Sequence, residues 1–205
     1  FGGAAAMEKE MLPERAEATY AGHVGNDGSA IAWGQQLGAR LADLGAYQGH
    51  GSWAVPQGAL ISWALMMEGG VQINAKGERF HDETQGYSEA AVHVLAQPGG
   101  VAWNVFDDAL LSFAQDFPDF VAAQGAGAVQ HAADTVALAQ LIACPHEALQ
   151  ATLNAVQSGT DPVTGRHFKR ALQTPLHAIK DTGAKIHTQC GHDIDEHARV
   201  LREEG

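Results

Sequence analysis

The sequence predicts an α+β fold, in which mixed helices and a small antiparallel sheet with a hairpin are flanked by helical and extended segments. Three observations predict this class. Several segments space their apolar residues at helical intervals, two short extended segments flank a Lys76-Gly77 turn, and no internal repeat or low-complexity tract is present. A chain of 205 residues is long enough for one domain with a single core, or for one and a half small domains.

The first third of the chain predicts two helices and an irregular segment. Residues Glu8–Ala18 are typical of a short polar helix, interrupted by Pro13. After the turn Gly25-Asn26-Asp27-Gly28, a second helix is expected over Ser29–Leu44, with one apolar face that includes Ile31, Trp33, Leu37, Leu41 and Leu44. Residues 45–60 are rich in glycine and contain Pro56, so they predict loop or irregular strand.

The middle of the chain predicts a hairpin, two helices and a strand. Residues 71–74 and 79–81 are the two arms of the hairpin. Ser88 caps a helix that runs to about Gln97, with Val92 and Leu95 facing inward, and Val101–Phe106 is a strand. Asp107-Asp108 then caps a short helix that ends near Phe113.

The last third predicts two further helices and a weakly patterned tail. Asp134-Thr135 opens one helix, and Pro145 opens the other, which carries Leu149, Leu153 and Val156 on one stripe. Residues 158–167 are a loop. The tail, residues 177–205, alternates weakly and has Ile186, Ile194 and Val200 as its few anchors.

Composition and charge exclude several classes of protein. The formal charge of −12 disfavours nucleic acid and anionic membranes as partners, and no run of about 18 apolar residues predicts a membrane helix. Two distant cysteines, and no basic segment like that of a signal peptide, favour a reducing, cytoplasmic location. Because the chain opens on Phe1, we expect it to be processed or cut from a longer protein.

Histidine supplies one candidate site. Gly-x-Gly-x-x-Gly, Gly-Lys-Ser/Thr and Gly-x-Ser-x-Gly motifs are absent, but 11 histidines are present. Four potential ligands, His187, Cys190, His192 and His197, fall within 11 residues, although their spacing matches no standard zinc motif. The alternatives are a metal centre that activates water for hydrolysis and a set of solvated side chains. The four tryptophans are expected in the core or in a pocket wall.

Arg79 is a second candidate. It follows Glu78 and precedes Asp82 and Glu83 at the rim of the predicted hairpin. Such a guanidinium is either part of a surface ion pair, which spacing alone favours, or a fixed receptor for a carboxylate.

The order of short motifs resembles a known family. The motifs are Gly25-Asn26-Asp27-Gly28, Gln48-Gly49-His50, Leu60-Ile61-Ser62, Glu68-Gly69-Gly70 with Asn74, Gly77, Arg79 and Phe80, Phe106-Asp107-Asp108, and His187-Thr188-Gln189. In this order they resemble the FAD-dependent fumarate reductase and succinate dehydrogenase flavoproteins, a group that includes 3-ketosteroid dehydrogenases. The resemblance runs from about residue 20 to residue 197.

The resemblance implies a separate function for each part of the chain. Residues 1–44 and 178–205 are flanks that contact the flavin domain, and residues 45–177 are a capping domain over the substrate. Arg79 is the proton-donating arginine, and His50, Ser62, His187 and Thr188 bind substrate. Asp27 and Gly28 lie near the flavin, which exchanges a hydride with an activated carbon of the substrate.

Departures from the family pattern limit what this chain is expected to do alone. The glycine fingerprint of the dinucleotide-binding strand is absent, so we expect no FAD to be bound without a separate flavin-binding domain. Trp63 and Met66 stand where the resemblance places a Glu and an Arg of a proton relay, which favours a substrate more apolar than fumarate.

The flanks suggest a further hypothesis about how the segment stays soluble. They carry charged or polar residues where the resemblance implies apolar ones: Glu8, Lys9, Glu10, Arg15, Asp181, Lys185 and His192. These charges would suit a segment excised or re-surfaced, by design or evolution, as a stand-alone scaffold, or flanks that self-associate. Ordinary sequence drift is the alternative.

Overall fold

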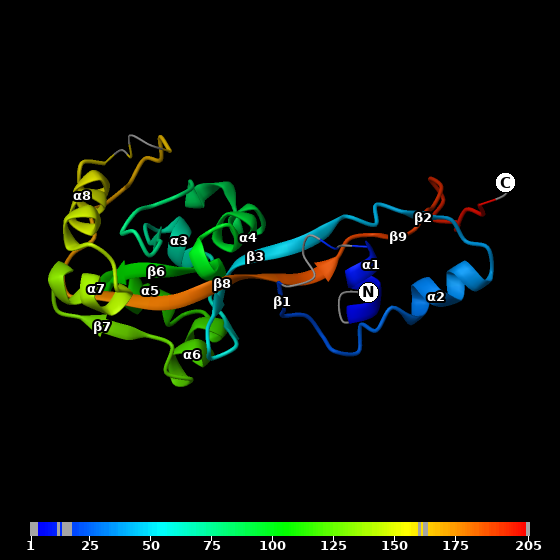
Figure 1. Cartoon of the computed structure of the whole chain (residues 1–205), viewed down its shortest axis with the longest axis horizontal. Coiled ribbons are helices and arrows are strands. Elements are labelled where there is room, and N and C mark those ends of the chain that lie inside the picture. Colours follow the sequence, from blue (N-terminus) through cyan, green and yellow to red (C-terminus); the bar gives the residue numbers. More distant parts are fainter. Residues whose placement is uncertain (1–3, 12, 14–17, 160, 162–163, 204–205) are drawn as a thin grey trace. The chain divides into compact units, whose positions relative to one another are not determined.

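The computed structural model describes residues 4–203 except 12, 14–17, 160 and 162–163. It divides into two compact units, one of residues 1–49 and 184–205 and the other of residues 50–183. The predicted α+β class is confirmed by a seven-stranded sheet, a separate two-stranded sheet, and helices between the strands (Figure 1). The functions predicted for residues 1–44, 45–177 and 178–205 stay predictions.

The first unit combines two short helices with short strands. Its elements are α1 (Ala5–Met11), β1 (Thr19–Tyr20), α2 (Ser29–Gln36), β2 (Leu41–Ala42) and β9 (Gly191–His192), together with the ends of β3 and β8. Strand β1 pairs in parallel with β8 at Ala184 and Lys185, and β2 pairs antiparallel with β9. A small apolar cluster surrounds Ile31, with partly buried Met7, Met11, Leu41, Tyr47 and Cys190 packed against it.

The second unit is built on a sheet whose central strand is β8. The strand order is β4-β3-β8-β6-β5, and β7 also pairs with β8. The strands are β3 (Tyr47–Ala54), β4 (Ala59–Leu60), β5 (Val71–Ile73), β6 (Val101–Asp107), β7 (Gln130–Ala132) and β8 (Leu176–Thr188). The helices are α3 (Ala64–Met67), α4 (Tyr87–Leu95), α5 (Asp108–Ala114), α6 (Pro118–Gly125), α7 (Thr135–Ile142) and α8 (His146–Gln157).

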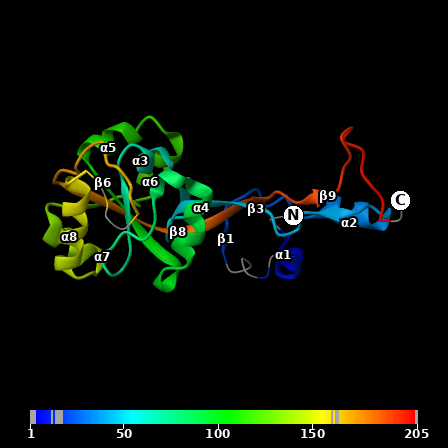
Figure 2. The ribbon, with the colours of Figure 1, turned by 90° about the horizontal axis from the view of Figure 1, so that it is seen from above.

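Alternation along the strands divides the core of this unit into two clusters. Phe106 and Ile179 face one way, into a cluster with α3, α4, α5 and α6. Their neighbours Val105 and Ala178 face the other way, into a cluster with α7 and α8. Helices α7 and α8 lie side by side in both views (Figures 1 and 2).

Local signals predicted several elements of the second unit well. Strand β6 lies where the apolar run predicts it, and Asp107 caps α5 by accepting a hydrogen bond from Leu110 N at 3.1 Å. Asp134 caps α7 in the same way, and Leu149 and Val156 are buried on α8.

Five expectations about local structure were wrong. The expected hairpin is absent, because β5 pairs with β6 and residues 79–81 form no strand. Helix α2 ends at Gln36, and residues 47–54 form a regular strand. Val92 on α4 is exposed rather than inward-facing. The tail is not weakly structured, because it contains the 13-residue strand β8, whereas Ile194 and Val200 are about half exposed.

The hypothesis of re-surfaced flanks also needs correction. Glu8 and Lys185 are buried and form an ion pair of 2.7 Å, and Asp181 is 0% exposed. These three charges therefore do not increase the polarity of the surface, whereas Lys9 and Glu10 on α1 are exposed, as the hypothesis expects. Arg15 lies outside the described residues. Among the described helices, none combines the length and the apolar run that crossing a bilayer requires.

Candidate functional site

A cavity of about 520 Å³ lies within the first unit. It is lined by residues of the loop before α2, of α2 itself and of the segment around β9: Gly25, Asn26, Asp27, Gly28, Ser29, Ala30, Ile31, Trp33, Thr188, Cys190, Gly191 and His192. Of the residues predicted from the sequence, it brings Asp27, Gly28, Thr188, Cys190 and His192 together.

The loop before α2 is shaped by Asp27 and Gly28. Oδ1 of Asp27 accepts hydrogen bonds from Ser29 N at 2.9 Å and from Ser29 Oγ at 2.6 Å. The bond from the Ser29 hydroxyl is the main cause that lowers the pKa of Asp27, so the carboxylate is charged at neutral pH. Gly28 adopts φ +79°, a left-handed conformation that favours glycine. These contacts hold the loop at the rim of the cavity.

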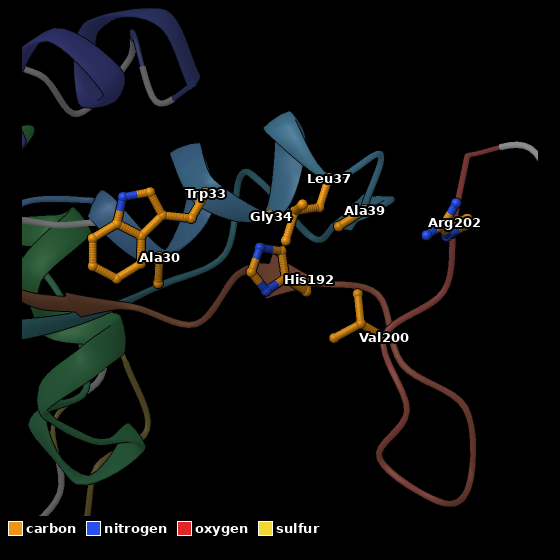
Figure 3. Close-up of a pocket in the computed structure, with 8 residues that line it drawn as sticks. All are labelled: Ala30, Trp33, Gly34, Leu37, Ala39, His192, Val200 and Arg202. Carbon is orange, nitrogen blue, oxygen red and sulfur yellow. The ribbon is translucent and has the colours of Figure 1, made fainter.

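An apolar groove of about 440 Å³ in the same unit shares Ala30, Trp33 and His192 with the cavity (Figure 3). Trp33 is 65% exposed and Leu37 is 75% exposed, so Trp33 forms a pocket wall and not part of the core. Figure 3 shows the His192 ring beside Gly34. A Cβ at Gly34 would lie 1.8 Å from His192 Nε2, so only glycine permits this approach.

The predicted metal ligands do not form a metal centre. Within the described part of the chain, no group of three or more His, Cys, Asp or Glu side chains is arranged to hold a metal ion. His187 Nδ1 lies 3.3 Å from the Thr188 carbonyl oxygen, and the exposed His197 ring lies 3.7 Å from the Glu196 carboxylate. The hydrolytic alternative therefore has no support in the structure.

In the second unit, His50 lies in a group of aromatic rings. Its imidazole stacks on the Tyr87 ring, with centroids 5.0 Å apart and planes at 20°, and contacts Trp63 edge-on at 6.3 Å. His50 is 8% exposed, whereas Tyr87 at the start of α4 is 38% exposed. Ser62 directly precedes Trp63, which places this predicted residue beside the same group. Sequence reasoning missed Tyr87, which had no recognisable motif of its own.

His50 is a neutral donor. Burial lowers its pKa to about 4, so the ring carries no charge at neutral pH. Because the backbone N–H of Ser52 can only donate, its 3.3 Å contact requires His50 Nδ1 to accept. The ring proton is therefore on Nε2, where it can be donated to a carbonyl or carboxylate oxygen.

Arg79 lies in a buried network of charges. Its guanidinium bonds to Glu83, to Asp161 at 2.9 Å and to the His81 carbonyl oxygen at 3.0 Å. The expectation of a surface ion pair was wrong, because the Arg79 side chain is only 4% exposed. Its partners are Glu83 and distant Asp161 rather than Glu78 and Asp82.

A second arginine completes this network. Arg166 Nη1 contacts Glu83 Oε2 at 2.7 Å, and its guanidinium also donates to the carbonyl oxygens of Gly70 and Met66. Both guanidinium groups lie over the Phe168 ring, at 4.9 Å for Arg79 and 4.6 Å for Arg166. Burial alone raises the pKa of Glu83, but hydrogen bonds and charge from the two arginines outweigh it and lower that pKa. The network is thus ionised and cross-links three segments of the unit.

The residues around the cavity fit one part of an FAD molecule better than another. Three glycines, at positions 25, 28 and 191, leave room for a flat ring to approach the backbone. No lysine or arginine is among the described residues that line the cavity, so the charge of a pyrophosphate would not be balanced there. The cavity therefore suits the ring end of a flavin.

Comparison with known proteins identifies relatives of the whole chain. A family model described as FAD binding domain matches residues 1–205. The chain is 26% identical over 208 residues to the NADH:fumarate oxidoreductase of Klebsiella pneumoniae (strain 342), and 30% identical over 181 residues to the cytochrome fumarate reductase of Shewanella frigidimarina. These matches cover 98% and 85% of this chain but 22% and 31% of the relatives, so the chain spans less than a third of either relative.

Solved structures share the fold. The open conformation of a flavocytochrome c3 fumarate reductase matches with a TM-score of 0.80 and 25% identity, over all of this chain and 37% of that one. A 3-ketosteroid Δ1-dehydrogenase from Sterolibacterium denitrificans, in complex with 1,4-androstadiene-3,17-dione, matches with a TM-score of 0.73 and 22% identity, over all of this chain and 43% of that one.

Proposed function

Since this chain belongs to the FAD binding domain family, we propose that it forms the substrate-capping part, and one side of the flavin site, of a fumarate reductase-like oxidoreductase. The reaction would be hydride exchange with an activated C–C bond. The observation that carries this proposal is the glycine-lined cavity, because it joins the Gly25–Ser29 loop to Thr188 and Cys190. A bound flavin would supply the hydride chemistry there.

We propose that the rest of the flavin site comes from sequence outside this chain or from a partner chain. The described residues of the cavity lining include no cation for the pyrophosphate, and the chain spans less than a third of the curated relatives described above. The chain would then not be catalytic by itself. Residues 1–44 and 178–205 would contact the flavin-binding part, and residues 45–177 would cover the substrate.

His50, Tyr87 and Ser62 are proposed to act on the substrate from the second unit. Neutral His50 would donate its Nε2 proton to a substrate oxygen, and the Tyr87 hydroxyl would give or take the proton at carbon. His187 and Thr188 are also proposed to bind substrate.

Arg79 is better suited to positioning than to proton transfer, although the resemblance assigns it the latter role. Its guanidinium bonds to two buried carboxylates and stacks on Phe168. An arginine held in this way remains protonated and fixes the segment between β5 and α4.

The proposed substrate is more apolar than fumarate. Trp63 and Met66 are both buried, and they replace the charged residues that the resemblance places at their positions. The chemistry of the site therefore favours a ketone or enone with a hydrocarbon body over a dicarboxylate.

Replacing Tyr87 by phenylalanine tests this assignment. The ring stack on His50 would survive, but the proton-transferring hydroxyl would be lost. In a chain that carries the whole flavin site, we expect the variant to slow reoxidation of the reduced flavin by 1,4-androstadiene-3,17-dione about 10²–10⁴-fold. Stopped-flow absorbance under anaerobic conditions measures this rate, with fumarate as the comparison oxidant.

Tyr20→Phe is the matched control, because it removes a hydroxyl whose contact is the His23 carbonyl oxygen in the first unit. The control should react like the unmodified protein. Reoxidation of the Tyr87→Phe variant at the rate of the unmodified protein would exclude Tyr87 as the proton carrier. Faster reoxidation of the unmodified protein by fumarate than by the dione would contradict the proposal of an apolar substrate.

A further inference from the structure

A row of buried polar side chains crosses the sheet of the second unit. Gln72 on β5, Asn104 on β6 and Asp181 on β8 are each 0% exposed. Gln72 pairs with Asn104, and Asp181 pairs with Ala102, two residues from Asn104, so all three side chains share one face. The same face carries Phe106 and Ile179 of the apolar core. Burying a polar group beside an apolar core costs free energy of folding unless the group is hydrogen-bonded, so we expect these side chains to have specific partners.

Gln72, at the β5 end of this row, contacts several of its neighbours. Its Nε2 donates to the Gly51 carbonyl oxygen and to Asp181 Oδ2, both at 2.7 Å, and its backbone N donates to Glu83 Oε1 at 2.9 Å. Its Oε1 lies 2.7 Å from His81 Nε2. The side chain of Gln72 therefore connects β5 to β3 and β8, and its backbone connects β5 to the network of Arg79 and Glu83.

The direction of each bond follows from Gly51. A carbonyl oxygen can only accept, so the amide nitrogen of Gln72 must face Gly51 and its oxygen must face His81. His81 then donates from Nε2 and is neutral, in agreement with burial, which lowers its pKa to about 4. The orientation of Gln72 is thus determined by its surroundings.

Asp181 is the second acceptor of the Gln72 side-chain amide. Only one of its carboxyl oxygens has a hydrogen-bond partner among the described side chains, and Oδ1 is buried without one. Burial raises the pKa of Asp181 well above its ordinary value, because burial disfavours the charged carboxylate. What Gln72 requires from Asp181 is an oxygen atom that accepts its second side-chain hydrogen bond.

Gly51 links Gln72 to the site. It directly follows His50, and a Cβ at Gly51 would lie 2.3 Å from Ala90 Cβ and 3.0 Å from Ala91 N. Strand β3 thus lies directly against α4, and Tyr87 is the first residue of that helix. The bond from Gln72 fixes the peptide next to His50 at the point where the strand meets the helix.

We propose that Gln72 is a positioning residue for the proposed site: through the Gly51 carbonyl it holds His50 against Tyr87, with Asp181 as its second acceptor. The assignment rests on the proposed function only in taking His50 and Tyr87 as site residues. Its test needs no flavin, so its failure can be told apart from failure of that function.

The test follows the titration of His50 by NMR in this chain. In the unmodified chain His50 should titrate near 4. Gln72→Met keeps the shape of the side chain but removes the donor to the Gly51 carbonyl oxygen. Water should then reach the His50 ring, and the pKa of His50 should rise toward its ordinary value of about 6.5. Asp181→Asn retains an oxygen acceptor and should leave the titration of His50 unchanged.

Gln97→Met is the matched control. Gln97 is a part-buried amide on the same unit that bonds to Asn74 and to the His93 carbonyl oxygen, away from Gly51. An unchanged His50 titration in Gln72→Met, or an equal rise in Gln97→Met, would overturn the proposal. If Gln72→Met does not fold, hydrogen exchange of the Gln72 side-chain amide in the unmodified chain provides the test. Exchange that occurs only through global unfolding supports the bonds to Gly51 and Asp181. Fast exchange contradicts them.

Discussion

Replacing Glu83 by glutamine is expected to remove about 3–5 kcal/mol from the free energy of unfolding of the second unit. The Glu83 side chain is 0% exposed and contacts both Arg79 and Arg166. Glutamine keeps the shape but leaves two buried guanidinium groups with less compensating charge. Urea unfolding at neutral pH, followed by circular dichroism, measures the loss.

The same network predicts a dependence on pH. The pKa of Glu83 is lower in the folded protein than in the unfolded chain, so its contribution is present above the unfolded value, about 4.3, and is lost as the pH falls below it. The Glu83→Gln variant should lose less stability on acidification than the unmodified chain. Glu78→Gln, at an exposed position, is the control, and equal effects of the two substitutions would refute a structural role for the network.

Replacing Lys185 by methionine should destabilise the first unit by a similar amount, about 3–5 kcal/mol. Lys185 Nζ lies 2.7 Å from Glu8 Oε2, and both side chains are less than a tenth exposed. Methionine at position 185 would leave the Glu8 carboxylate buried without a cation. Oε1 of Glu8 already has no hydrogen-bond partner among the described residues.

A double-mutant cycle isolates this pair. Changing Glu8 and Lys185 together to methionine should restore most of the stability, because two apolar side chains of similar length need no compensating charge. Lys9→Met, at an exposed position of α1, should change little. Additive losses in the double variant would show that the ion pair does not couple α1 to β8.

Elements with local signals could be predicted from the sequence, whereas those that depend on distant partners could not. The α5 helix was recognisable because Asp107 caps it within one turn. Strand β8 was missed because Lys180, Asp181 and Lys185 interrupt its apolar pattern. Only the distant partners Gln72 and Glu8 explain why Asp181 and Lys185 are buried. The arm of the expected hairpin was misplaced for the same reason, since β5 pairs with β6.

The candidate site shows the same division. Asp27, Gly28 and Thr188 were predicted through family motifs, and the structure places them around one cavity. The stack of His50 on Tyr87 has no signature in the spacing of the sequence, because a strand and a helix far apart in the chain create it. Arg79 was recognised as unusual, but its burial depends on Asp161 and Arg166, which no local pattern connects to it.

The most direct test of the account is to map flavin binding on this chain by NMR, with riboflavin and FAD as separate ligands. We expect weak binding of equal strength for both, amide shifts confined to the residues that line the cavity between residues 25–33 and 188–192, and no flavin retained after gel filtration. Shifts elsewhere, or stoichiometric FAD that remains bound, would contradict the claim that these residues form only the ring side of a flavin site.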